Sequence, residues 1–194
     1  MSLIEVPHTK STITAKVSKS TTAAATEATA ETREHVAMRY TFATTRIALG
    51  TVFLWAFADK LIGLDHATPG AKSWLNGGSP TTGFLKGVQG PFADTFNSMA
   101  GSAWADWLFM AGLLGIGVAL ILGVGMRVAA VSGTLMLVFM WAAVLPIKTH
   151  PFIDDHLIYA VVLFGLAFMH AGDTAGLGKL WSKLSIVKRF PALR

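Results

Sequence analysis

Hydropathy along the chain separates one polar stretch from four apolar ones. Residues 1–39 are polar, and 17 of the 24 residues from 9 to 32 are Ser, Thr or Ala. The four apolar segments that follow lie at about residues 42–64, 107–126, 128–147 and 156–172. The second and third are 20 residues each without a charged side chain. A helix of that length crosses a bilayer core about 30 Å thick.

This pattern predicts an all-α integral membrane protein built as a four-helix bundle. Arg127 alone separates spans two and three, so we expect them to form a tight helical hairpin. A long outer loop, residues 65–102, is predicted between spans one and two. It contains SWLNGGSPTTGFL and GPFAD, whose apolar anchors and Gly/Pro turns we interpret as interfacial or partly re-entrant segments packed over the bundle.

The same pattern gives the domain organisation and one packing prediction. We expect a polar Ser/Thr/Ala-rich tail over residues 1–39, a four-span membrane domain over 40–178 and a basic tail over 179–194. The polar tail is too poor in apolar residues to bury a core, and a short helix around 27–39 leads into the first span. In span two, Gly115, Ala119 and Gly123 recur every four residues, which favours close helix packing in lipid.

Composition agrees with a membrane protein and narrows the chemistry. The chain of 194 residues is 53% hydrophobic and only 14% charged, whereas soluble domains carry about 25% charged residues. It has no cysteine. Disulfides, iron–sulfur clusters, Cys-ligated zinc and covalent c-type haem are therefore excluded as parts of this chain.

Basic residues predict the orientation. Twelve of the sixteen Lys and Arg residues fall on the side of the two termini, and only Lys60, Lys72, Lys86 and Lys148 fall on the other. By the positive-inside rule, both termini are cytoplasmic. Topology thus accounts for the net charge of +5, so no nucleic-acid partner is expected. The basic, apolar tail after Lys179 suits contact with the anionic lipid of the inner leaflet.

Ionisable residues gather at the predicted outer ends of the spans. We expect five of them to cluster there as a candidate catalytic group: Asp59, Lys60, Asp106, Asp155 and His156. Charges at that depth need partners, so we expect Lys60 to pair with Asp106 or Asp155, and Asp59 to face His156.

A His–carboxylate pair at the interface suits proton exchange with a quinone headgroup, because His titrates near neutral pH. Trp55, Trp141 and Tyr159 are the candidate walls of the quinone slot. The alternative is a set of helix-end ion pairs that only fix packing. Asp154 and Asp155 could also cap the helix that follows them.

Metal and haem sites are weaker alternatives. His150 and His156 flank two aspartates, which could form a metal site, and His156 and His170 lie about four helical turns apart, as haem ligands could. Candidate partner histidines for haem lie outside the spans, and spacing alone does not support a metal. We therefore predict neither a metal nor a haem.

Three stretches carry a family resemblance: RIALGTVFLWAFADKL at 46–61, WLFMAGLLGIGVALILGVGMRVAAVSG at 107–133 and PFIDDHLIYA at 151–160. With them the chain resembles the DoxX/DoxD-like family of small four-span membrane proteins. SWLNGGSPTTGFL and GPFAD make it similar to the branch of the large membrane subunit of thiosulfate:quinone oxidoreductase.

The resemblance implies a subunit of the prokaryotic cytoplasmic membrane that works with a second, smaller subunit and passes electrons from an outer sulfur donor to quinone. Without a thiol, thiosulfate would be held by cations and backbone N–H groups, and Lys60, Lys72 and Lys86 are available as the cations. The alternative function is a non-catalytic accessory subunit of a larger respiratory membrane complex. Solute transport has less support, because the spans carry no charged residue near mid-membrane.

Overall fold

The computed structural model describes residues 9–148 and 150–194, and over these residues it contains helices and no strand. The chain divides into two compact units, Met1–Arg39 and Tyr40–Arg194, and helix α1 (Thr9–Ile62) has residues in both. The helix expected only over 27–39 therefore begins much earlier. Residues 9–49 contain no Gly or Pro, and nine of them are Ala, the residue with the lowest helix-forming cost.

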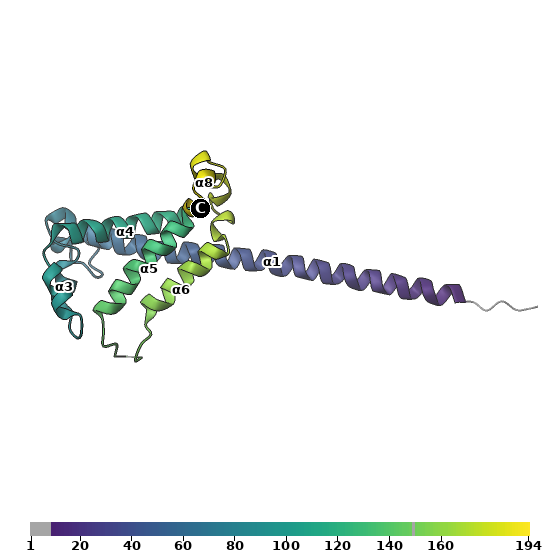
Figure 1. Ribbon diagram of the computed structural model, residues 1–194, viewed down its shortest axis with the longest axis horizontal. Coiled ribbons are helices and arrows are strands. Elements are labelled where there is room, and N and C mark those ends of the chain that lie inside the picture. Colours follow the sequence, from purple (N-terminus) through teal and green to yellow (C-terminus); the bar gives the residue numbers. More distant parts are fainter. Residues whose placement is uncertain (1–8, 149) are drawn as a thin grey trace, which may run out of the picture. The chain divides into compact units, whose positions relative to one another are not determined.

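Four apolar helices build the second unit: residues 40–62 of α1, α4 (Ala103–Leu122), α5 (Met126–Ala143) and α6 (Asp155–Phe168) (Figure 1). Three stretches of the described residues are long and apolar enough to cross a membrane: Ala30–Ile62, Ala103–Leu122 and Met126–Ala143. The all-helical class and three of the four predicted apolar spans are thus confirmed. Helix α6 is apolar but only 14 residues long, which corresponds to about 21 Å.

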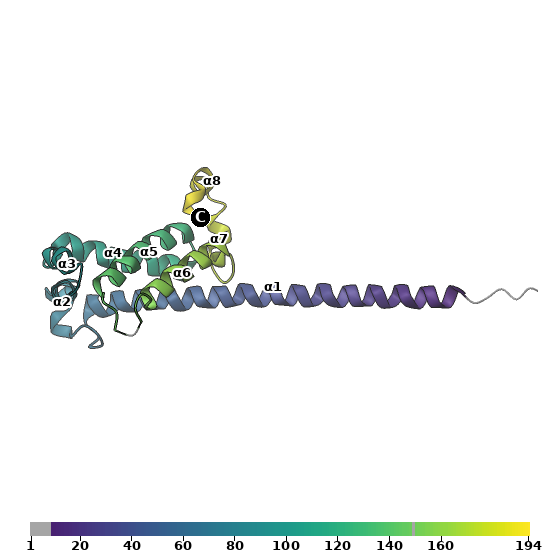
Figure 2. The ribbon, with the colours of Figure 1, turned by 60° about the horizontal axis from the view of Figure 1, so that its bottom comes forward.

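Figure 2 shows α4, α5 and α6 against the part of α1 that belongs to this unit. One hydrophobic core joins these four helices. Its buried side chains include Phe53 of α1, Leu113 of α4, Leu137 of α5 and Leu163 of α6. The core runs along the bundle from the end that carries Ile62 and Ala103, here called the loop end, to the end that carries Leu122 and Met126, here called the lobe end.

The hairpin turn between α4 and α5 lies earlier than predicted. Helix α4 ends at Leu122, and Gly123 and Gly125 both adopt positive φ, +71° and +60°. Glycine takes this left-handed backbone without a Cβ penalty and so ends the helix. Arg127 is therefore not the separator but part of the first turn of α5. Hydropathy did not show the turn, because Gly-Val-Gly is itself apolar.

Close packing also uses other glycines than the sequence suggested. A Cβ on Gly115 would meet no atom within 4 Å, so the predicted stripe is wrong at that position. A Cβ on Gly117 would lie 2.7 Å from the Leu54 side chain of α1, and one on Gly133 would lie 2.6 Å from Leu163 of α6. The helices pack closely on these faces because a glycine on one helix leaves space for a leucine side chain of the other.

Four short helices fold the segment between α1 and α4: η1 (Gly70–Lys72), η2 (Trp74–Asn76), α2 (Thr82–Gly87) and α3 (Ala93–Met99). Leu85, Val88 and Phe96 are buried there against Ala143 of α5. This small second core packs the segment over the loop end of the bundle.

A buried arginine connects three segments of the chain at the lobe end. Arg46 is 0% exposed, and its Nη1 donates to the carbonyl oxygens of Leu120 and Ile121 in the last turn of α4. Its Nη2 donates to the carbonyls of Thr174 and Ala175. The last carbonyls of a helix have no partner within the helix, and a cation there also favours the helix dipole. Arg46 thus joins α1, α4 and the chain after α6.

The chain after α6 forms η3 (Ala171–Asp173), α7 (Gly178–Trp181), α8 (Ser185–Arg189) and η4 (Pro191–Leu193). Residues 174–194 are called the carboxy-terminal lobe below. Figure 1 shows it, in yellow-green and yellow, at the end of the bundle where α4 meets α5.

Candidate functional site

A groove of about 540 Å³ lies between α4 and α5. Its size falls within the range of small-molecule sites. The lining residues recur at helical spacing on the facing sides of the two helices, among them Trp104, Leu108, Gly112 and Ile116 on α4 and Ser132, Met136 and Met140 on α5. Figure 1 shows the two helices diverging from the turn that joins them. The short helices α2 and α3 cover the wider end with Phe84, Leu85, Phe96 and Met99.

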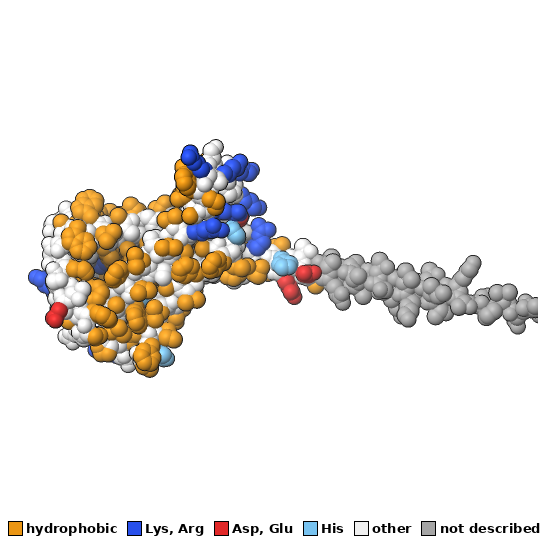
Figure 3. Space-filling model, in the orientation of Figure 1, with side chains coloured by type: hydrophobic (Ala, Val, Ile, Leu, Met, Phe, Trp, Pro, Cys, Tyr) orange, Lys and Arg blue, Asp and Glu red, His pale blue; other side chains and the backbone are white. Residues whose placement is uncertain are grey.

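The groove opens sideways onto an apolar surface. Trp104 is 58% exposed, and Leu108, Leu135 and Phe139 on its rim are exposed as well. Figure 3 shows hydrophobic side chains covering this face of the bundle. Large apolar surfaces of this kind are covered by lipid in a membrane protein. A molecule dissolved in the bilayer can therefore reach the groove laterally.

Polar groups stand mainly at the loop end of the groove. Lys60, in the last turn of α1, is half-buried and places Nζ 5.9 Å from the centre of the Phe109 ring, a cation–π contact. The Thr81 hydroxyl donates to Asp106 Oδ1 over 2.6 Å, and the Thr81 amide donates to the same oxygen over 3.1 Å. The Lys60 ammonium is therefore a hydrogen-bond donor beside the apolar lining. The Thr81 hydroxyl oxygen is an acceptor, because its proton is already donated to Asp106.

Two of the five predicted site residues belong to this end of the groove. Lys60 lines it, and Asp106, in the first turn of α4, lies behind Thr81 and also accepts the Ser79 hydroxyl over 2.8 Å. Asp59 has a different place: it is 2% exposed and accepts the amides of His66 and Ala67 over 3.3 and 3.2 Å. It holds the chain where the chain reverses after α1.

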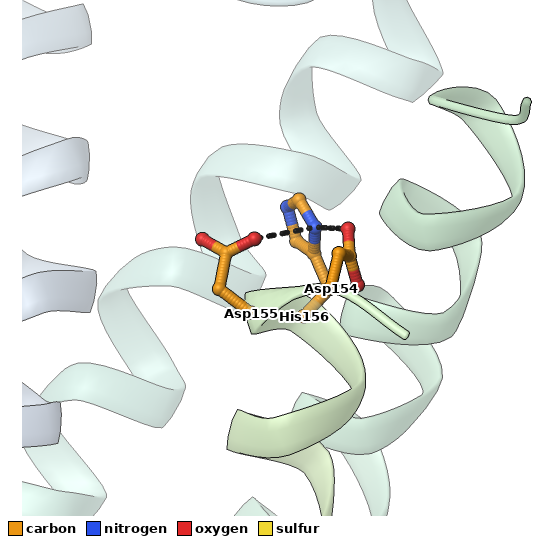
Figure 4. A group of neighbouring side chains, drawn as sticks. All are labelled: Asp154, Asp155 and His156. Carbon is orange, nitrogen blue, oxygen red and sulfur yellow. Dashed lines mark hydrogen bonds and ion pairs between the residues drawn. The ribbon is translucent and has the colours of Figure 1, made fainter. Parts of the chain in front are cut away.

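Asp155 and His156 form a third group, together with Asp154 (Figure 4). His156 Nδ1 lies 2.6 Å from Asp154 Oδ2 and 3.5 Å from Asp155 Oδ1. Asp154 is the N-cap of α6 and accepts the Leu157 amide over 3.3 Å, so the capping interpretation is confirmed for this residue. Ligand atoms of the three side chains lie within 4.8 Å of one another. His150 does not join them: its Nδ1 accepts the amides of Phe152 and Ile153.

The expected ion pairs across the helices are not formed. In the part of the chain that the structure describes, the ion pairs at this end join His156 only to Asp154 and Asp155. Lys60 pairs with neither Asp106 nor Asp155, and Asp59 does not meet His156. The reason is local: amides and hydroxyls next to Asp59 and Asp106 already satisfy these carboxylates.

The aromatic residues chosen from the sequence do not wall this groove. Trp55 is an exposed residue edge-on to His66, Trp141 donates its indole N–H to the Phe152 carbonyl over 2.9 Å, and Tyr159 packs against the main core. Trp104, Phe84, Phe109 and Phe139 take that place. For Trp104, Phe109 and Phe139 the signal in the sequence was the helical recurrence of apolar positions on 104–116 and 132–140, but only the fold shows that these two faces meet. Phe84 belongs to α2 and had no such signal.

Comparison with known families places the groove in a wider context. The model of the DoxX family matches residues 42–146, more than half of the chain. The chain belongs to the DoxX family. All residues that line the groove of this DoxX protein lie inside the matched region, whereas Asp154, Asp155 and His156 lie beyond it. No curated protein and no solved structure matches the chain. The family and the apolar helices together make this DoxX chain a multi-pass membrane protein.

Proposed function

We propose that this protein is a quinone-binding membrane subunit of respiratory electron transfer. The observation that carries the proposal is the groove between α4 and α5, which joins an apolar, laterally open lining to one ammonium group. A membrane quinone has the matching form, with a long hydrocarbon tail and a ring that carries two carbonyl oxygens.

The residues present fit such a molecule. Apolar side chains of α4 and α5 suit the tail, and Lys60 can donate a hydrogen bond to a ring carbonyl. Hydrogen bonds to charged donors are stronger than neutral ones. Thr81, whose own proton is bound by Asp106, can accept a hydrogen bond from the reduced ring. These three residues form the binding end of the proposed site.

Reduction of a quinone to a quinol takes two electrons and two protons. We propose that the electrons come from a partner subunit that oxidises a sulfur donor such as thiosulfate, as the resemblance implies. Protons reach the site from water, and the His156 imidazole, which lies between Asp154 and Asp155, is the proposed proton carrier. A non-catalytic accessory subunit is the competing function, and the experiments below separate the two.

Quinone binding is expected to depend on Lys60. Decylubiquinone, titrated into the protein in lipid nanodiscs, should quench the fluorescence of Trp104 on the groove rim. Loss of a hydrogen bond to a charged donor costs about 1.5–3 kcal/mol, so Lys60→Gln should weaken binding by roughly 10- to 150-fold. Lys72→Gln, at an exposed position outside the groove, is the matched control. Equal binding by both variants would remove the groove as the quinone site. Trp104→Phe checks that the signal is local.

His156 is expected to affect turnover without affecting binding. His156→Gln roughly keeps the size and the hydrogen bonding of the side chain but removes the imidazole, which can take up and release a proton. Donor-to-quinone electron transfer in membranes that contain the assembled complex should fall, while decylubiquinone affinity stays at the wild-type value. Unchanged electron transfer per assembled complex, at normal protein levels, would favour the accessory function instead.

We further propose that α6 is a fourth span and that both termini lie in the cytoplasm of a prokaryote. The twelve-to-four split of the basic residues supports this orientation. The proposed organisation is an amino-terminal tail over 1–39, a membrane domain over 40–178 and a basic tail over 179–194.

The topology can be tested with cysteines, because the chain has none of its own. Single changes Ser20→Cys and Ser79→Cys are treated with a membrane-impermeant thiol reagent in intact cells. Position 79 should be labelled, and position 20 should be labelled only after the cells are permeabilised. Labelling at 20 but not at 79 would reverse the orientation, and labelling at both in intact cells would show that α1 does not cross the membrane.

A further inference from the structure

The carboxy-terminal lobe has an unusual charge content. Residues 174–194 carry five basic residues and no acidic one: Lys179, Lys183, Lys188, Arg189 and Arg194. Apolar residues alternate with them along α7, α8 and the connecting turns. The lobe is thus a compact basic surface with apolar side chains.

Contacts with the bundle hold the lobe at one position. The Leu177 amide donates to the Leu122 carbonyl over 2.8 Å, and the Arg127 amide donates to the Arg194 carbonyl over 2.9 Å. Within the lobe, the Trp181 indole N–H donates to the Leu193 carbonyl over 2.6 Å. Arg194 also pairs with Asp173 over 3.0 Å. The lobe is therefore fixed to the ends of α4 and α5 rather than tethered by a loose chain.

The other four cations are exposed and point to a partner. Lys179, Lys183, Lys188 and Arg189 form no ion pair within the residues that the structure describes, and Figure 3 shows the basic side chains gathered on the lobe. Four large apolar side chains are exposed beside them: Leu180, Leu184, Ile186 and Phe190. Water alone would not favour this combination, but a phospholipid interface would, since it offers anionic phosphates next to hydrocarbon.

The position of the lobe favours the same partner. It adjoins the residues where α4 ends, α5 begins and α6 ends, which is where these membrane helices leave the hydrocarbon. We infer that the lobe is a docking surface for anionic phospholipid headgroups. Its lysines and arginine bind phosphates, its apolar side chains enter the headgroup layer, and Arg127 and Arg194 transmit this anchoring to α5. This inference is independent of the quinone site at the other end of the bundle.

The test uses the full chain in nanodiscs. The chain has no cysteine, so Ile186→Cys gives a single attachment point for a spin label. The accessibility of this label to oxygen and to a water-soluble nickel complex reports its contact with lipid. The nanodiscs contain phosphatidylcholine alone or equal amounts of phosphatidylcholine and phosphatidylglycerol. The label should be more deeply buried with phosphatidylglycerol, and added salt should reduce the difference, because it screens the attraction between the cations and the headgroups.

Charge variants identify the surface. Lys179→Gln with Lys183→Gln should reduce the phosphatidylglycerol retained by the protein, counted by native mass spectrometry, by about fivefold for each cation removed. Lys72→Gln with Lys86→Gln removes two other exposed cations, which lie outside the lobe, and should leave retention unchanged. All four side chains are exposed, so neither pair should disturb folding, which thermal unfolding checks. The inference would be overturned if the label had the same depth in both kinds of nanodisc, or if both pairs of variants lost the same amount of phosphatidylglycerol. It would also be overturned if the lobe retained an acidic protein but no lipid.

Discussion

Replacing Arg46 with methionine should lower the stability of the bundle by about 3 kcal/mol or more. The guanidinium is completely buried and binds carbonyl groups from α4 and from the chain after α6. Methionine fills much of the space but donates no hydrogen bond. Each buried carbonyl left without a partner costs about 1–3 kcal/mol. Several are lost at once, so most of the folded protein should be lost at growth temperature.

Thermal unfolding of the detergent-purified protein measures this effect, alongside the yield of monodisperse protein. Arg33→Met is the control, because Arg33 is an exposed arginine of the same helix. Arg46→Lys should fall between the two, since a single ammonium cannot reach both sets of carbonyls as the guanidinium fork does. Equal stability of Arg46→Met and Arg33→Met would show that Arg46 does not hold the lobe end together.

Blocking the groove should have the second large effect. Ser132 lines the groove from α5, is exposed and donates only to the Val128 carbonyl of its own helix. Ser132→Trp therefore places a large side chain in the groove with little cost to folding. Overfilling a packed space costs about 1–3 kcal/mol, so decylubiquinone should bind roughly 5- to 150-fold more weakly.

Val131→Trp supplies a matched control for this change. Val131 is the neighbouring residue, is 61% exposed and does not line the groove. Quinone retained through purification in mild detergent, extracted and quantified per mole of protein, should be near the wild-type value for Val131→Trp and strongly reduced for Ser132→Trp. Equal retention in the two variants would place the quinone elsewhere, and retention by neither variant nor wild type would argue against quinone binding itself.

The helices of the bundle were predictable because crossing a bilayer is a local requirement. A stretch of about 20 apolar residues has to shield its own backbone groups in hydrocarbon, whatever it packs against. The apolar stretches 107–126 and 128–147 thus predicted two helices, which the structure contains as α4 and α5. Their ends were displaced, because the Gly-Val-Gly turn is as apolar as the helices it separates and Pro146 lies three residues beyond the end of α5.

The residues of the candidate site could be predicted from the sequence, but their partners could not. Asp59, Lys60, Asp106, Asp155 and His156 were chosen for their charge near span ends, and the structure places all five near the ends of α1, α4 and α6. Their partners were not predictable. Local amides and hydroxyls satisfy Asp59 and Asp106, so Lys60 turns to an aromatic ring and to the groove instead.

By itself, the sequence determined the helical membrane class, the family and the residue types available for chemistry, since composition and short motifs contain all three. Only the tertiary structure decided which faces meet. The groove depends on the distance between α4 and α5, and the role of Arg46 depends on contacts 74 to 129 residues away along the chain. Such contacts are set by how large and small side chains fit between helices, as at Gly117 and Gly133. No local pattern of hydrophobic and polar residues specifies that fit.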